Sequence, residues 1–221
     1  MKTFEEMVSV RIVGVTQPVV DEIPDSEGLI SYQARVSNPK NQTNFKTAKG
    51  LIKYCMRHQH WSVMEMANVV VEIKAPRDIS RQILRHRSAN FQELSQRYTA
   101  VDDFVVREAR LQDETNRQNS IETDDEELKE WWYEAQEEAL SVCQQVYTAA
   151  LEKGIAKECA RVVLPEGNTM STLYMNATVR TWYHYATLRA SPETQKEHRQ
   201  VAIMVMQELK KYFPNVFEGE Q

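Results

Sequence analysis

The apolar and polar positions of this chain follow two periods, one typical of strands and one typical of helices. Residues 8–16, VSVRIVGVT, are rich in β-branched residues and predict a strand. A valine and isoleucine run at 69–73 predicts a second strand, which ends at Pro76. Residues 104–106 predict a short strand, whereas residues 169–177 fit either a strand or a connection.

Other segments repeat their apolar residues every three to four positions, as amphipathic helices do. The longest one predicts a helix that starts with a capping box between Thr123 and Glu126 and ends at Gly154. The predicted helices cover residues 28–37, 43–58, 77–84, 124–151, 178–190 and 193–212. In the last helix the residues expected to face inward are Val201, Met204, Val205 and Leu209.

The predicted long helix carries an extended apolar stripe. Its members are Leu128, Trp131, Trp132, Ala135, Ala139, Val142, Cys143, Val146, Tyr147 and Ala150. The polar segment just before it, RLQDETNRQNSIETDD at 110–125, predicts a mobile loop near residues 107–122. No repeat, low-complexity tract or linker divides the chain, so residues 1–221 predict a single catalytic domain of the α+β class.

Composition narrows the class of protein. The 221 residues include 42% apolar and 27% charged residues, which is ordinary for a globular protein. No window approaches the ~18 apolar residues of a membrane span, and no secretory signal is evident at the N-terminus. An odd number of cysteines, 3, favours a reducing compartment. We expect a cytoplasmic protein, either bacterial or, if viral, in the host cytoplasm, with no membrane partner.

The glycines exclude two phosphate-binding motifs. The 6 glycines are scattered, whereas a Rossmann fingerprint or a P-loop needs clustered glycines for backbone N–H groups to reach phosphate. Any phosphate must therefore be held largely by side chains. Residues 77–98, RDISRQILRHRSANFQELSQRY, are the candidate, because they concentrate arginine in a chain of net charge −5.

Arg77, Arg81 and Arg85 recur every four residues and share one helix face, where like charges repel by about 0.2–0.5 kcal/mol per pair. A solvated face with surface ion pairs is one interpretation. A nucleotide site is the other, because arginine forks suit phosphate and because Glu93 and Ser95 suit sugar or base groups. The helix is expected to break near His86, since Arg85 and Arg87 would otherwise point apart.

A second basic set follows far along the chain: Arg161, Arg180, His184 and Arg189. Ion pairs with the acidic region 122–138 are one interpretation, and contacts to two ligands or subunits are the other. No metal site is expected, because the C-x2-H-x-H pattern of Cys55, His58 and His60 has no second ligand pair. Neither Ser95 nor any of the cysteines has the neighbours of a nucleophile.

The sequence RHR at 85–87, followed seven residues later by Ser95 and then QRY, resembles the signature of flavin-dependent thymidylate synthases. Further matching features occur in the family's order: ARVS at 34–37, His60, Glu65, Arg81-Gln82, ARVVLP at 160–165 and VRTWYHYATLR at 179–189. The resemblance extends over most of residues 30–205.

The resemblance implies an enzyme that methylates dUMP at C5 to form dTMP. Carbon would come from 5,10-methylenetetrahydrofolate and hydride from FAD reduced by NADPH, without a cysteine nucleophile. The family resemblance also implies a mixed α/β fold without a Rossmann motif and a homotetramer whose active sites are shared between subunits.

Matched positions imply roles for individual residues. The FAD site would include Ser62, Arg85, His86, Arg87, Glu93, Thr178, Val179, Arg180 and His184. The nucleotide site would include Gln82, Ile83, Leu84, Arg85, Glu93, Leu94, Ser95, Gln96, Arg97, Arg161 and Arg189. Arg189 would be catalytic, because a permanent cation stabilises a uracil deprotonated at N3.

The chain departs from the family pattern at a few positions. Asn90 and Gln92 replace a usual serine and asparagine, and Thr178 replaces an asparagine. Glu193 and Met66 stand where histidines occur in other members. These changes bear on FAD more than on the nucleotide. Two further interpretations are a non-catalytic nucleotide- or RNA-binding protein, which a pI of about 5.6 disfavours, and an inactive relative.

Overall fold

The computed structural model describes residues 1–217 and is built around a four-stranded antiparallel sheet of order β2-β3-β8-β4. The strands are β2 (Ser9–Val15), β3 (Asn68–Pro76), β8 (Met170–Thr178) and β4 (Asn90–Glu93). Central strand β3 buries Val69, Val71 and Ile73 completely, because alternate side chains of a strand point to one face. The segment at 169–177, which fitted either a strand or a connection, forms strand β8.

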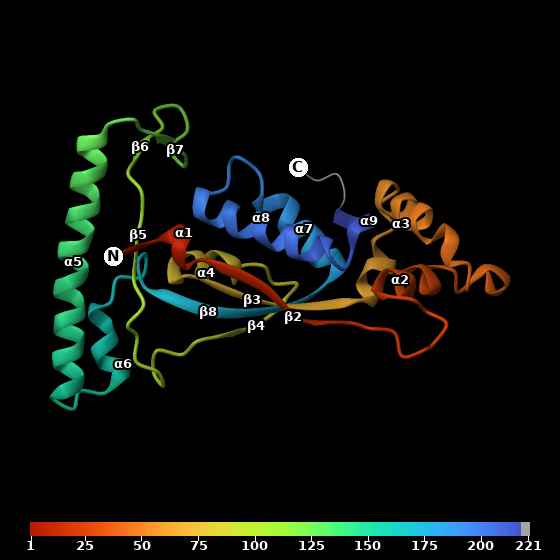
Figure 1. The fold of residues 1–221 in the computed structure, drawn as a ribbon, viewed down its shortest axis with the longest axis horizontal. Helices are drawn as coiled ribbons and strands as arrows, with labels where there is room; N and C mark the ends of the chain where they lie inside the picture. Colours follow the sequence, from red (N-terminus) through yellow and green to blue (C-terminus); the bar gives the residue numbers. More distant parts are fainter. Residues whose placement is uncertain (218–221) are drawn as a thin grey trace.

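One face of the sheet is covered by helices α7 (Val179–Arg189) and α8 (Lys196–Lys210), as Figure 1 shows. Fully buried Trp182 of α7 donates from its indole nitrogen to the carbonyl of Val69 at 3.0 Å. Val201, Val205 and Leu209 of α8 are also fully buried, as the period predicts, while Met204 is half-buried. The main core therefore lies between the sheet and these helices.

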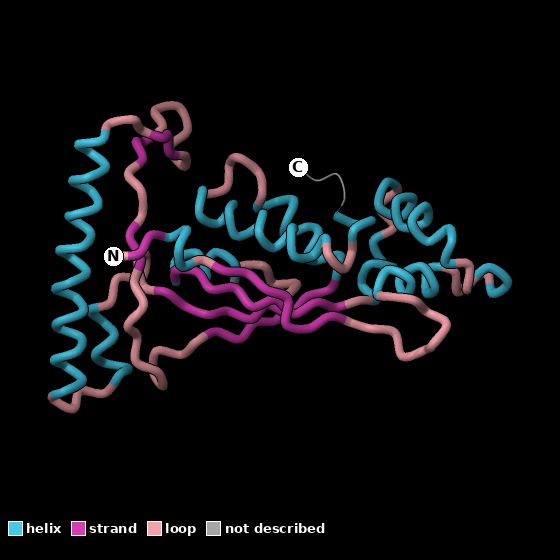
Figure 2. The backbone as a smooth tube through the Cα atoms, in the orientation of Figure 1, coloured by secondary structure: helices cyan, strands magenta, loops and turns pink. Residues whose placement is uncertain are grey.

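The remaining elements surround this core (Figure 2). The short strands are β1 (Lys2–Thr3), β5 (Val105–Val106), β6 (Arg110–Gln112) and β7 (Ser120–Glu122). The other helices are α1 (Phe4–Met7), α2 (Ser26–Ala34), α3 (Ala48–Arg57), α4 (Arg77–Ile83), α5 (Glu126–Glu152), α6 (Lys157–Ala160) and α9 (Pro214–Phe217). Short 3-10 turns cover Pro39–Asn41, Phe45–Thr47, Trp61–Met66 and Arg161–Val163.

Two expectations about the long helix and its neighbourhood need correction, and a third is confirmed. Asp125, not Thr123, caps α5, because its side chain accepts from the backbone of Leu128. Residues 107–122 are not a structureless loop, since β6 and β7 pair as a hairpin. Gly154 does end α5, with φ of +80°, a conformation that glycine adopts without steric cost.

The apolar stripe of α5 remains largely uncovered. Of the 27 residues in this helix, Gln136, Leu140 and Tyr147 are buried, and Leu140 packs against Val101 and Phe104 in a small second core. Trp131 is 60% exposed and Val142 is 55% exposed. In Figure 1 the helix stands at one end of the molecule, which explains why one face finds no partner within the described chain.

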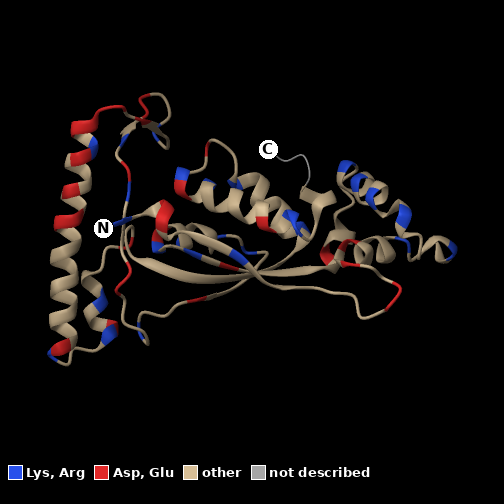
Figure 3. Cartoon of the chain, viewed as in Figure 1, with Lys and Arg blue, Asp and Glu red and all other residues tan. Residues whose placement is uncertain are grey.

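Charges are distributed unevenly between the two ends (Figure 3). Acidic side chains gather on the first half of α5, whereas basic side chains gather on α3. No helix among residues 1–217 is long and apolar enough to cross a membrane.

Candidate functional site

The arginines of α4 share two carboxylates, which offsets the repulsion expected along their helix face. Arg81 lies 2.9 Å from Glu93 and 3.2 Å from Glu166, and Arg77 lies 3.6 Å from Glu93. Ser171 of β8 donates to the second oxygen of Glu93 at 3.0 Å. Strand β4 thus places Glu93 beside the arginines of α4. This placement is possible because α4 ends near His86 and the chain then becomes extended.

Arg77 is a buried member of this cluster. The interpretation of a solvated helix face is wrong for Arg77, because its side chain is only 11% exposed. Burial lowers the pKa of Arg77, and the charge of Glu93 counters that effect. The helical spacing could have revealed that Arg77 belongs to this cluster, since Arg77 shares a helix face with Arg81.

A cleft of about 510 Å³ opens beside these arginines. Arg77, Arg81, Gln96, Arg161, Glu158 and Glu166 contribute its polar lining. The Nε2 atom of Gln96 is buried and has no hydrogen-bond partner among the described residues. Within residues 1–217 Arg161 has no ion-pair partner, whereas Arg97 pairs with Glu158 at 3.2 Å. The cleft therefore offers unsatisfied donors.

A second group of predicted residues lies between α4, α7 and α8. Arg189 donates from Nε to Nε2 of His86 at 3.0 Å, so His86 accepts and carries its own proton on Nδ1. Burial, and then the charge of Arg189, lowers the pKa of His86 to about 4. The neutral imidazole of His86 thus holds the guanidinium of Arg189. The two terminal nitrogens of Arg189 bond to no described residue.

Gln82 belongs to this second group although it adjoins Arg81 in sequence. Its Oε1 atom lies 3.1 Å from Nδ1 of His198, and its Nε2 atom donates to Gln195 at 2.7 Å. His198 is completely buried, with Nε2 3.2 Å from the hydroxyl of Tyr185. The sequence analysis assigned no role to His198, Tyr185 or Gln195, because their contacts come from separate segments.

Some of the residues predicted to hold FAD lie where the turn at 61–66 meets α7, whereas Glu93 and His86 belong to the two groups described above. Arg180 forms an ion pair with Glu65, and His184 packs edge-on against Trp61 at 4.6 Å. Burial, and then the charge of Arg180, lowers the pKa of His184. Thr178 caps α7 by accepting from the backbone of Thr181 at 3.2 Å. Threonine fills the capping role that the usual asparagine also suits.

The residues predicted for the two ligand sites range from fully buried to exposed. Ile83 and Val179 are fully buried in the core, and Leu84 packs against it. The exposed or partly exposed positions are Ser62, Arg85, Arg87, Leu94 and Ser95. The proposed ion pairing of Arg180 and Arg189 with region 122–138 is wrong, because they contact Glu65 and His86 instead.

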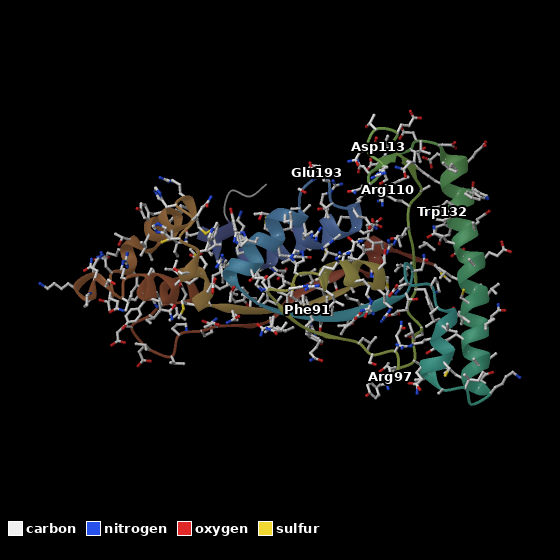
Figure 4. All side chains as sticks on the ribbon, turned by 180° about the vertical axis from the view of Figure 1, so that it is seen from behind. Phe91, Arg97, Arg110, Asp113, Trp132 and Glu193 are labelled. Carbon is white, nitrogen blue, oxygen red and sulfur yellow. The ribbon has the colours of Figure 1, made fainter. Side chains whose placement is uncertain are left out.

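The two groups of predicted nucleotide residues are held by separate sets of contacts. In Figure 4 Arg97 and Glu193 lie on opposite sides of the sheet that carries Phe91. Among residues 1–217 no hydrogen bond or ion pair joins the cleft of Arg161 to the Arg189 group. The same residues contain no cluster of at least three side chains suited to a metal ion.

The sequence of this chain is similar to those of known proteins. The sequence model of the family described as "Thymidylate synthase complementing protein" matches residues 18–215. A "Probable flavin-dependent thymidylate synthase" from Paramecium bursaria Chlorella virus 1 is 49% identical over 210 residues, covering 95% of this chain and 97% of the relative. The flavin-dependent thymidylate synthase of Synechocystis sp. is 47% identical over 212 residues, with the same coverages.

A solved structure extends the similarity to the fold. The UMP/dUMP methylase PolB from Streptomyces cacaoi, bound with 5-Br dUMP, superimposes with a TM-score of 0.78 at 28% identity. The match covers 96% of this chain and 93% of that chain.

Proposed function

This chain belongs to the family of flavin-dependent thymidylate synthases, and from that premise we propose that it binds dUMP and FAD and forms dTMP with 5,10-methylenetetrahydrofolate as carbon donor. NADPH is the proposed reductant. The matched features reach from the α2 segment to α8, so nearly the whole chain supports the same assignment.

The observation that carries the proposal is the unsatisfied donor of Gln96 in a cleft lined by arginines. A buried amide without a partner costs about 1–3 kcal/mol, so its retention indicates a ligand with an acceptor atom. Glu158 and Glu166 are more than half exposed and can turn away when an anion binds. A nucleotide phosphate is therefore the ligand that we assign to this cleft.

The uracil end of dUMP is assigned to Arg189. Its guanidinium stays charged at all working pH values, and His86 fixes it through Nε alone. The terminal nitrogens remain available for a base that carries negative charge after loss of its N3 proton. Such a charge raises electron density at C5, where the new carbon is attached.

The residues present also fit FAD. Arg85 and Arg87 are exposed on the turn after α4 and have no ion-pair partner within residues 1–217, which suits a pyrophosphate. Trp61 and His184 offer aromatic surface near Arg180. Bound FAD would supply the hydride of the reaction, while these side chains bind and orient it.

We also propose a homotetramer. One dUMP needs both the Arg161 cleft and Arg189. Within residues 1–217 no hydrogen bond or ion pair joins these two groups, which suits a site to which a second copy contributes one of them. The exposed face of α5 supports association, because Trp131, Val142 and Val146 form an apolar stripe that the described chain does not cover. Burying apolar area of this kind favours association through the hydrophobic effect.

The test is an assay of the purified protein. With FAD, dUMP, methylenetetrahydrofolate and NADPH, we expect NADPH oxidation and formation of dTMP, and no dTMP when the folate is omitted. The flavin absorption band should change on addition of dUMP, because both ligands share one site. A folded, flavin-loaded tetramer that forms no dTMP would refute the proposal.

A further inference from the structure

A continuous series of hydrogen bonds runs from the largely buried ion pair of Arg110 and Glu197 to the side chain of Gln82. Arg110 of β6 donates to Glu197 Oε1 at 2.7 Å, and Gln195 Nε2 donates to Glu197 Oε2 at 2.9 Å. Gln195 Oε1 then lies 2.7 Å from Gln82 Nε2. The series continues from Gln82 Oε1 to His198 and ends at Tyr185, as described above.

The charged end fixes the direction of every bond in the series. Glu197 is only 3% exposed, and an ionised carboxylate can only accept. Burial raises the pKa of Glu197, but the hydrogen bond from Gln195 and the charge of Arg110 outweigh it and leave the pKa below its ordinary value. Gln195 must therefore turn its NH2 group toward Glu197 and its oxygen toward Gln82.

The donor and acceptor roles of Gln82, His198 and Tyr185 follow from the orientation of Gln195. Because Gln195 presents an oxygen, Gln82 must donate to it from Nε2 and turn Oε1 toward His198. Neutral His198 then carries its proton on Nδ1 and accepts from Tyr185 at Nε2. Burial raises the pKa of Tyr185, which keeps its hydroxyl protonated as that donor.

Gln82 is half-buried and keeps one N–H that no described residue accepts. We propose that Glu197 and His198 are positioning residues, which lock the Gln82 amide so that it donates to an acceptor oxygen of the bound nucleotide. The inference rests on the proposed function in that the ligand is dUMP. The nucleotide atom that faces Gln82 is then a hydrogen-bond acceptor, such as a carbonyl or phosphate oxygen.

The inference also gives the 107–122 segment a role. Arg110 comes from the β6–β7 hairpin, and Lys196 of α8 lies 2.9 Å from Glu108 and 2.7 Å from Glu122. Figure 4 shows Arg110 beside the hairpin loop that carries Asp113. The hairpin thus secures the N-terminus of α8, where Gln195 and Glu197 begin the series.

Kinetics with dUMP test the proposal. His198→Asn retains a donor near the position of Nδ1, whereas His198→Leu removes it. We expect His198→Leu to raise KM for dUMP about five- to tenfold, as loss of one positioned hydrogen bond implies, and His198→Asn to restore most of it. Gln195→Ala, at an exposed position that does not threaten folding, should raise KM about threefold.

A double-mutant cycle separates positioning from general stability. In a Gln82→Met background, His198→Leu should change KM for dUMP by less than about twofold, because its route to the nucleotide is already gone. Multiplicative effects of the two substitutions would overturn the proposal. Tyr147→Phe is the matched control for Tyr185→Phe, since Tyr147 is an equally buried tyrosine remote from the series; only Tyr185→Phe should raise KM.

The ligand-free protein offers a readout that does not depend on turnover. Nitrogen-15 NMR of the histidine rings should show His198 as the Nδ1–H tautomer in wild type, and Glu197→Gln should mix the tautomers because the amide series loses its fixed direction. An Nε2–H tautomer in wild type would overturn the inference even if dTMP is formed. Absence of dTMP with the Nδ1–H tautomer present would instead count against the proposed function.

Discussion

Replacement of Arg189 by alanine is the substitution for which the structure predicts the largest specific loss. The side chain donates to His86 through Nε at 3.0 Å and keeps both terminal nitrogens unpaired among the described residues. Two charge-assisted hydrogen bonds to a uracil anion are worth about 1.5–3 kcal/mol each, so the expected loss is about 4 kcal/mol. At 1.36 kcal/mol per decade, kcat/KM should fall about 10³-fold.

Flavin binding should survive this substitution. Arg189 holds one residue of the predicted FAD site, His86. The FAD residues around Arg180 and Trp61 make contacts that do not involve Arg189, so most of the FAD site remains. The assay compares the flavin absorption band with single-turnover dTMP formation for Arg189→Ala, for Arg189→Lys and for the control Arg199→Ala. Arg199 lies on α8 and contacts only the carbonyl of Pro192 in the structure.

The lysine variant makes the test sharper. Lysine keeps the charge but cannot hold His86 and present a planar fork at once, so its rate should fall between those of wild type and the alanine variant. Wild-type activity in Arg189→Ala, or an equal loss in Arg199→Ala, would refute the assignment of Arg189.

Further predictions address the cleft, the assembly and the effect of pH. Arg161→Ala should weaken dUMP binding tenfold or more by calorimetry while leaving the melting temperature nearly unchanged, because Arg161 has no ion pair within residues 1–217 to lose; a large fall in melting temperature with intact dUMP affinity would contradict this. Val142→Glu should dissociate the oligomer in light scattering, whereas Thr148→Glu on another side of α5 should not, and identical masses for both would exclude the stripe as an interface. His198 has a pKa lowered to about 3 by burial and nearby positive charge, so the unfolded chain binds its proton first as pH falls below about 6.5. As the pH falls from 6 to 4.5, this residue should therefore lower the free energy of unfolding by about 1.4 kcal/mol per pH unit. Urea titrations of His198→Asn should show a dependence of the unfolding free energy on pH that is smaller by this amount.

The sequence alone determined many of the local elements and the family. A run of valine and isoleucine specified β3, and the helical period specified α4, α7 and α8, because both patterns depend on which side chains an element must bury. The order of RHR, Ser95, ARVVLP and VRTWYHYATLR indicated the family, and scattered glycines indicated that any phosphate would have to be held largely by side chains. These are properties of short segments, so neighbouring residues suffice to reveal them.

Tertiary structure alone decided which side chains meet. The carboxylate of Glu93 reaches Arg77 and Arg81 because β4 runs beneath α4, and Gln82 meets His198 because α8 packs across the sheet. The period of α5 showed an apolar stripe but could not show that Trp131 and Val142 stay exposed, because a period reports amphipathicity and not the surface that covers it. Contacts between distant segments depend on how the elements pack in three dimensions, and no local pattern encodes that packing.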